Sequence, residues 1–139
     1  MRTARLMTMV LAAVVALSAA PLAAAKPGPR HLTLSNKDNR QTVVVHTGDE
    51  IDVRLSGERK ENSDWLWSAP SSANGAVLHR HSTGRAAGAD TVAVFHAHSD
   101  GTTTLDSELR CVSRKSGYSC SRVAVPWEVT VTVKTRKKK

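Results

Sequence analysis

The chain has 139 residues, of which 20 are Lys or Arg and 12 are Asp or Glu, so its formal net charge at pH 7 is +8. Only 4% of the residues are aromatic. This length is typical of a single domain and excludes a multidomain enzyme.

The start of the chain, residues 1–25, has the pattern of a secretory signal peptide. Arg2 and Arg5 form a positively charged start, residues 6–17 are an apolar run, and alanines at 23–25 resemble a cleavage site. The apolar run is too short to cross a bilayer comfortably. We therefore expect a secreted, extracellular protein without a membrane span, whose mature form begins at Lys26.

Basic residues are concentrated at the other end of the chain. Beyond an expected domain over residues 26–133, the tail 134–139 contains Lys134, Arg136, Lys137, Lys138 and Lys139. Such a cluster can bind an anionic cell-wall polymer by releasing counterions, or it can remain solvated. No motif indicates specific nucleic-acid recognition, so we expect no nucleic-acid partner of that kind.

Export also predicts the state of the two cysteines. An oxidising compartment favours a bridge over free thiols, so we expect Cys111 and Cys120 to form a disulfide. A bridged sulfur provides no thiolate nucleophile. The bridge is therefore interpreted as structural.

Hydrophobic alternation of period two dominates the mature chain and predicts an antiparallel β-sandwich. The clearest run places Val123, Val125, Trp127, Val129, Val131 and Val133 on one face. Pro126 within this run indicates an edge position or a bulge. About eight short strands are expected, over residues 32–34, 42–46, 51–55, 65–67, 76–81, 91–98, 102–109 and 123–133.

Three polar connections between these strands are long. If successive strands reverse direction, the connections 56–64, 82–90 and 110–121 emerge together at one end of the sandwich. Loops held at their roots by rigid strands lose little entropy on binding a partner. A binding end is therefore one interpretation, and tolerated insertions are the other.

Several landmarks resemble a known family. They are Gly48-Asp49 before an alternating strand, Trp65-Leu66-Trp67 after a polar loop, Phe95-x-Ala97, and Gly101-Thr102-Thr103-Thr104-Leu105 before the valine-rich last strand. In this order they resemble the chagasin-like inhibitors of papain-family cysteine proteases, over about residues 41–134. The resemblance implies an immunoglobulin-like sandwich whose three loops at one end fill the protease cleft non-covalently.

The resemblance also implies contact residues, which are Asn62, Ser63, Asp64, Gly84, Gly88, Arg110 and Tyr118. The first loop departs from the family pattern because Asp64 stands where the family has a glycine. The third loop keeps the Arg of the family's Arg-Pro-Trp motif as Arg110 but lacks the Trp, which Tyr118 could replace. Trp65 and Trp67 are expected in the core or at its rim.

Two other groups of residues have a spacing that is also found in functional sites. His79-Arg80-His81 and His96-Ala97-His98 have a spacing that can bind Zn or Cu from one strand face, but solvated histidines are commoner and we expect no metal. Asp106 and Glu108 share a strand face, which is also typical of solvated charges. We therefore expect no cofactor and no enzyme activity.

The sequence thus predicts a secreted inhibitor of a papain-like cysteine protease. The alternative is a non-inhibitory extracellular module that binds a cell-wall or other anionic polymer, because a β-sandwich with exposed loops and a basic tail also suits adhesion.

Overall fold

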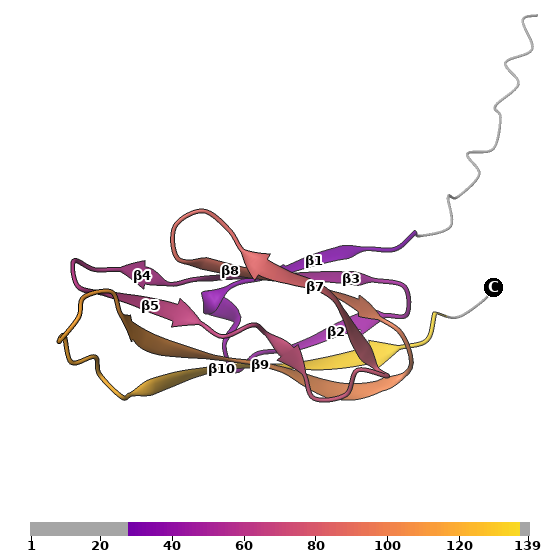
Figure 1. The fold of residues 1–139 in the computed structure, drawn as a ribbon. Coiled ribbons are helices and arrows are strands. Elements are labelled where there is room, and N and C mark those ends of the chain that lie inside the picture. The colour runs from indigo at the N-terminus through magenta and orange to yellow at the C-terminus, as the bar shows by residue number, and fades with distance from the viewer. Residues whose placement is uncertain (1–27, 137–139) are drawn as a thin grey trace, which may run out of the picture.

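The computed structural model describes residues 28–136, which form two β-sheets packed face to face (Figure 1). The predicted signal peptide, residues 1–25, and the last three lysines, residues 137–139, lie outside the described residues. The signal peptide and a binding role of the basic tail therefore remain predictions. Within residues 28–136, no helix has the length and apolar character needed to cross a membrane.

The first sheet has four strands. Their spatial order is β1 (His31–Leu34), β3 (Glu50–Ser56), β8 (Asp90–Ala97) and β7 (Leu78–Arg85). Alternation is strict in β8, where every second residue from Thr91 to Ala97 is buried and the residues between them are partly exposed. This pattern confirms that Phe95 and Ala97 face the core and that His96 faces outward.

The second sheet has six strands. In spatial order, β2 (Thr42–His46), β10 (Ala124–Lys134), β9 (Gly101–Ser113), β5 (Ser63–Trp67) and β4 (Glu58–Arg59) are neighbours, and β6 (Ser71–Ser72) also pairs with β9. A short 3-10 helix, η1 (Asn36–Asp38), connects β1 to β2 across the two sheets.

The core is formed by the inward faces of both sheets. Trp127 is 1% exposed and Phe95 is fully buried. The Trp127 indole N–H donates to the Ser35 carbonyl oxygen at 3.1 Å, so its polar atom is satisfied. Burying an aromatic side chain of this size contributes about 1.5–3 kcal/mol. The other buried apolar residues include Leu34, Ile51, Val53, Leu55, Leu78, Leu105, Val129, Val131 and Val133.

The all-β sandwich is confirmed, although its sheets are mixed rather than wholly antiparallel. Strand β1 runs parallel to β3, and β2 runs parallel to β10. Both parallel pairs arise because the chain crosses from one sheet to the other between β1 and β2 and again between β2 and β3. Alternation predicted which residues face the core, but it contains no information on strand direction.

Pro126 occupies an edge-like position within β10. The β10–β9 register continues without interruption from Ala124 to Val133, so there is no bulge at the proline. On the other side, β2 pairs with β10 only from Thr130 onward. Pro126 therefore faces no strand on that side and leaves no ladder hydrogen bond unmade.

Candidate functional site

Three connections leave the sandwich toward one end. In Figure 1, two of them lie at the far left, and the β7–β8 hairpin projects from the top of the first sheet, left of the middle. The first joins β3 to β5 through β4, the second is the β7–β8 hairpin, and the third joins β9 to β10. They are shorter than the sequence predicted because strand pairing extends into all three. Their unpaired tips are residues 60–62, 86–89 and 114–123, and we call the end that carries them the loop end.

Gly57 ties the first connection to the second. Its N–H donates to the Ala89 carbonyl oxygen at 3.0 Å, at the point where the chain leaves β3 for the other sheet. A Cβ atom at this position would clash with the Trp65 carbonyl oxygen and lie 2.7 Å from the Ala89 oxygen. The crossing therefore requires glycine. Sequence analysis missed Gly57, because a lone glycine does not reveal which distant backbone approaches it.

Arg114 ties the first connection to the third. Its N–H donates to the Asn62 carbonyl oxygen at 2.9 Å. Its guanidinium donates to the carbonyl oxygens of Lys60 and Glu61, and its Nε lies 3.1 Å from Asp64 Oδ1. Arg114 thus contacts every residue of the tip of the first connection, Lys60, Glu61 and Asn62. Sequence analysis missed Arg114 because only the strand register places it opposite Asn62.

The predicted residues of the first loop lie at different depths. Asn62 is half-buried in the tip, whereas Ser63 is the first residue of β5 and is only 2% exposed. Asp64 is half-buried, and its carboxylate pairs with Arg114. The Asp64 charge is therefore compensated within the molecule, and Ser63 presents almost no hydroxyl surface at the loop end.

The two glycines of the second loop also separate. Gly88 lies in the tip of the hairpin with φ of +74°, a left-handed conformation that glycine adopts without strain. Gly84 lies within β7, opposite Val92 of β8, and is exposed. Gly88 therefore belongs to the tip, and Gly84 lies on the strand that supports it.

The third loop contains the predicted disulfide. Cys111 and Cys120 are bridged, with their Cα atoms 5.7 Å apart, so the tip is anchored to β9. Tyr118 is exposed in this tip. Arg110, in contrast, lies within β9 on the outer face of the sheet, where its Nε donates to Glu108 at 3.0 Å. Sheet pairing extends beyond the expected strand end, so Arg110 belongs to the sheet and not to the loop.

Exposed apolar side chains are concentrated on the same third connection and its roots. Val112, Tyr118, Val123 and Val125 are 48%, 43%, 61% and 41% exposed, whereas apolar residues farther along β10 are buried. Val125 stands opposite Leu109, on the face that continues into the core. The valine-rich face predicted for residues 123–133 is therefore buried only from Trp127 onward, because the part of the sheet before it projects beyond the other sheet's last paired residues, Ser56 and Asp90.

The two His-x-His segments do lie on neighbouring strands. His79 is opposite His96, and a register shift between Arg80 and Ser82 displaces His81, whose ring stacks on that of His96 with 4.6 Å between centroids. His96 instead directs Nε2 to Glu50, at 3.1 Å from Oε2. The strand register thus brings one histidine of each segment into contact. The four histidines of the two segments do not form a group of metal ligands by themselves.

Carboxylates also meet on the outer face of the second sheet. Glu128 stands opposite Asp106, and the hydrogen bond and negative charge of Asp106 raise the pKa of the Glu128 carboxyl. The Thr104 hydroxyl donates a hydrogen bond to the Asp106 carboxylate, at 2.8 Å from Oδ2. Glu128 is exposed, so the pair lies on an open strand surface that offers a substrate no enclosure.

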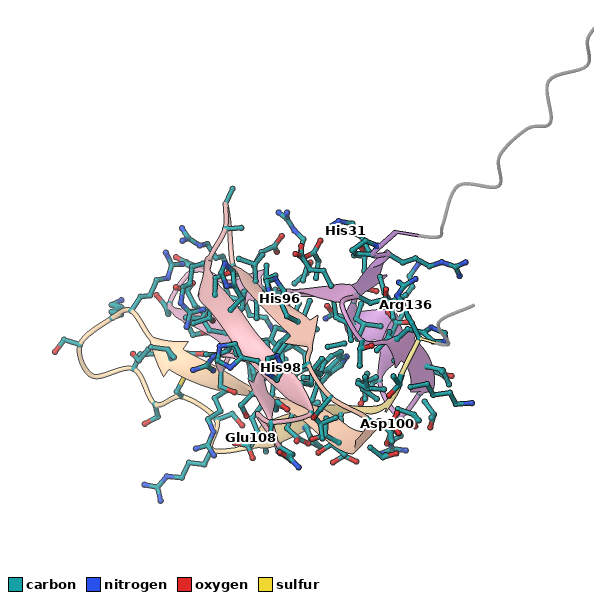
Figure 2. All side chains as sticks on the ribbon, turned by 90° about the vertical axis from the view of Figure 1, so that its right-hand side faces the viewer. His31, His96, His98, Asp100, Glu108 and Arg136 are labelled. Carbon is teal, nitrogen blue, oxygen red and sulfur yellow. A yellow bond between two sulfur atoms is a disulfide. The ribbon has the colours of Figure 1, made fainter. Side chains whose placement is uncertain are left out.

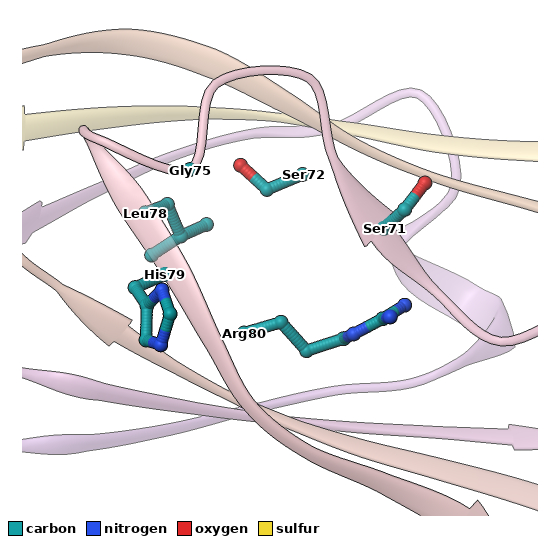
Figure 3. Close-up of a pocket in the computed structure, with 6 residues that line it drawn as sticks. All are labelled: Ser71, Ser72, Gly75, Leu78, His79 and Arg80. Atoms are coloured by element: carbon teal, nitrogen blue, oxygen red, sulfur yellow. The ribbon is translucent and has the colours of Figure 1, made fainter.

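A small hollow lies between β6 and the start of β7 (Figure 3). Its walls are formed by Ser71, Ser72, Gly75, Leu78, His79 and Arg80. The Arg80 guanidinium is held by the Pro70 carbonyl oxygen at 3.0 Å. One histidine and two serines without a bonded base do not form a nucleophile–base arrangement.

Comparison with known proteins gives a likeness in fold alone. No protein-family model and no curated protein sequence matches the chain. Among solved structures, the cysteine protease inhibitor EhICP2 from Entamoeba histolytica is 13% identical, with a TM-score of 0.54 over 78% of this chain and 100% of that chain.

Two further structures are similar at lower scores. Amebosin is 11% identical, with a TM-score of 0.47 over 77% of this chain and all of its own. PbICP-C, solved in complex with falcipain-2, is 13% identical, with a TM-score of 0.49 over 76% of this chain and 99% of its own. The architecture of this chain, two β-sheets packed face to face, is accordingly similar to the fold of the cysteine protease inhibitor EhICP2.

Proposed function

We propose that the protein is a secreted, non-covalent inhibitor of papain-family cysteine proteases and that its loop end blocks the active-site cleft. The observation that carries this proposal is the coincidence of three tied connections with four exposed apolar side chains at one end of the sandwich. The fold shared with the inhibitor EhICP2 supports it. Tolerated insertions would not require such ties between separate loops.

Rigidity is the physical basis of the proposed blockade. The disulfide anchors the third tip, and Arg114 fixes the first tip to it. A surface held in its binding conformation loses little conformational entropy on association. Both cysteines of the chain are bridged, so a covalent attachment through a free thiol is not part of the mechanism.

Binding energy in such interfaces is concentrated in a few anchors. We assign the central contact to Tyr118 and Val123 on the third connection, with Asn62 and Gly88 contributing from the other two tips. Ser63 and Asp64 support the first tip from behind. Gly84 and Arg110 lie on supporting strands, behind the proposed contact.

Enzyme inhibition tests the proposal directly. We expect the purified protein to inhibit papain competitively at submicromolar concentration. Tyr118→Ala and Val123→Ser should each weaken inhibition by roughly tenfold or more, the loss typical of an interface anchor. Arg114→Ala should weaken it similarly by releasing the first tip. Val44→Ser is the matched control, because Val44 is 53% exposed on β2 and lies outside the three connections.

The outcome also separates the two classes of function. The inhibitor proposal would be rejected if the protein inhibited neither papain nor related enzymes. Salt-sensitive retention on cell-wall material would then support the alternative, a polymer-binding module. Equal losses for Val123→Ser and Val44→Ser would contradict the assignment of the contact. Secretion is tested separately, by sequencing the N-terminus of the exported protein, which we expect at Lys26.

A further inference from the structure

A row of polar side chains crosses the outer face of the first sheet, away from the loop end. The strand register places His31 of β1 beside Glu50 of β3, and Glu50 beside His96 of β8. Since Ile51 and Phe95 are buried, their neighbours Glu50 and His96 face outward. Figure 2, which looks toward the end opposite the loop end, labels His31 and His96.

Glu50 lies between the two histidines and contacts both. Its Oε1 is 3.3 Å from His31 Nδ1, and its Oε2 is 3.1 Å from His96 Nε2. Asp52 follows two residues later on the same strand face. Ligand atoms of His31, Glu50 and Asp52 all lie within 4.8 Å of one another. Small side-chain rotations can therefore direct three atoms to one point.

Neither carboxylate is neutralised by a lysine or arginine. In the described part of the chain, Glu50 pairs with the two histidines, and Asp52 has no ion-pair partner. Nearby Arg54 is occupied by Asp90, at 2.9 Å. Two carboxylates without a lysine or arginine partner, beside an imidazole, favour a bound cation, and imidazole nitrogen with carboxylate oxygen is a ligand set that suits Zn²⁺.

The backbone holds this arrangement in place. The Glu50 N–H donates to the Arg30 carbonyl oxygen at 2.9 Å, and the Arg30 N–H donates to Asp49 at 2.9 Å. Both bonds fix the chain directly before His31 against the start of β3. Asp52 and Glu50 are fixed relative to each other by the strand. Only side-chain torsions remain to be ordered when a metal binds.

We propose that this face binds one divalent transition-metal ion, with His31 Nδ1, Glu50 and Asp52 as protein ligands and water completing the coordination. His96 is a positioning residue that holds the second oxygen of Glu50, as groups behind metal ligands commonly do. This site differs from the four-histidine cluster considered above, because His31, Glu50 and Asp52 lie outside both His-x-His segments. It also differs from the proposed protease contact.

Zinc titration of the protein, prepared without a polyhistidine tag and stripped of metal, tests the site. We expect one Zn²⁺ per chain by calorimetry. His31→Ala and Asp52→Asn should each weaken the affinity roughly tenfold or more. His98→Ala is the matched control, since this exposed histidine on the same side of the sandwich lies outside the ligand set. His96→Ala should weaken binding, and His96→Gln should restore part of it by again donating to Glu50.

Absence of stoichiometric zinc binding by the folded protein would overturn the proposal. So would binding that His31→Ala and Asp52→Asn leave unchanged, or that His98→Ala removes. Circular dichroism of each variant confirms that it is folded. Papain inhibition by the same variants should remain unchanged, so failure of the metal site and failure of the inhibitor proposal are distinguishable.

Discussion

At the scale of single residues, Asp49 joins both ends of the described chain to the β2–β3 turn. Its side chain is buried and accepts hydrogen bonds from the N–H groups of Arg30 and His46, at 2.9 and 2.8 Å. The Arg136 guanidinium pairs with the same carboxylate and also donates to the Thr47 carbonyl oxygen at 3.2 Å. Arg136 of the expected basic tail is therefore part of the folded body.

These contacts make the stability of the protein depend on pH. Burial raises the pKa of Asp49, but the hydrogen bonds from Arg30 and His46, with the Arg136 charge, lower the pKa overall below its ordinary value of 3.8. A carboxyl whose pKa is lower in the folded state stabilises that state above the unfolded pKa, and this contribution is lost as pH falls through the folded pKa. We therefore expect a loss of stability below about pH 4.

Asp49→Asn should lower the free energy of unfolding by about 2–3 kcal/mol at pH 7, because hydrogen bonds to a charged acceptor are lost. The difference from the unsubstituted protein should shrink as the pH falls below 4. Urea unfolding across this range, in buffer with a chelator, measures both. Asp52→Asn is the control, since Asp52 has no ion-pair partner in residues 28–136. A difference that stays constant down to pH 2 would contradict this account.

At the scale of elements, the crossing at Gly57 determines whether the first two connections meet. Gly57→Ala should lower the free energy of unfolding by about 1–3 kcal/mol, because the added methyl group overlaps the Trp65 and Ala89 carbonyl oxygens. It should also weaken protease inhibition by displacing both tips. Thermal unfolding and papain titration of the same sample measure the two effects.

Gly84→Ala provides the matched control for this substitution. A Cβ atom on Gly84 meets nothing within 4 Å, so the change should be nearly neutral in stability and in inhibition. If Gly57→Ala and Gly84→Ala behaved alike, the close approach at Gly57 would have no energetic role.

The disulfide makes a separate prediction for the third connection. It links residues nine apart in sequence, and a chain-entropy model gives about 2–3 kcal/mol for a loop of this size. Replacing Cys111 and Cys120 together by Ser should therefore lower stability by that amount and weaken inhibition, because the tip is no longer anchored to β9. Chemical unfolding and papain titration of the double variant test this. Unchanged inhibition would show that the anchored tip does not contribute to binding.

The elements also show how far the sequence could be used for prediction. The predicted bounds of β2, β3 and β8 agree with the structure to within one residue, because each strand is a short run rich in apolar and β-branched residues. Strand β4 was missed because its Glu58 and Arg59 are both exposed and give no hydrophobic signal. The end of β7 was missed for the same reason, since residues 79–85 are exposed on an edge strand.

The candidate site was predictable in outline and not in detail. Loop lengths and strand order were enough to place three connections at one end. Whether Arg110 or Arg114 lies in the third connection depends on how far β9 continues to pair with β5, which alternation does not determine. The burial of Ser63 and the exposure of Val123 depend on where one sheet extends past the other, which is a property of the packed pair of sheets.

At the scale of the whole molecule, the two proposed binding sites lie at different ends of the sandwich. The loop end carries the three tips, whereas the opposite end carries the β2–β3 turn, the Asp49 contacts and His31 beside Glu50. Rigid strands separate these ends, so a partner bound at the loop end would leave the proposed metal site accessible. We therefore expect protease and metal binding to be independent of each other.

Amide hydrogen exchange of the complex with papain tests the central claim most directly. We predict that complex formation slows exchange in residues 60–62, 86–89 and 114–123 together, and leaves the β2–β3 turn unchanged. The reason is that all three tips are excluded from solvent by one cleft. Protection of the β2–β3 turn or of the outer sheet faces, with the three tips still exchanging freely, would contradict the account.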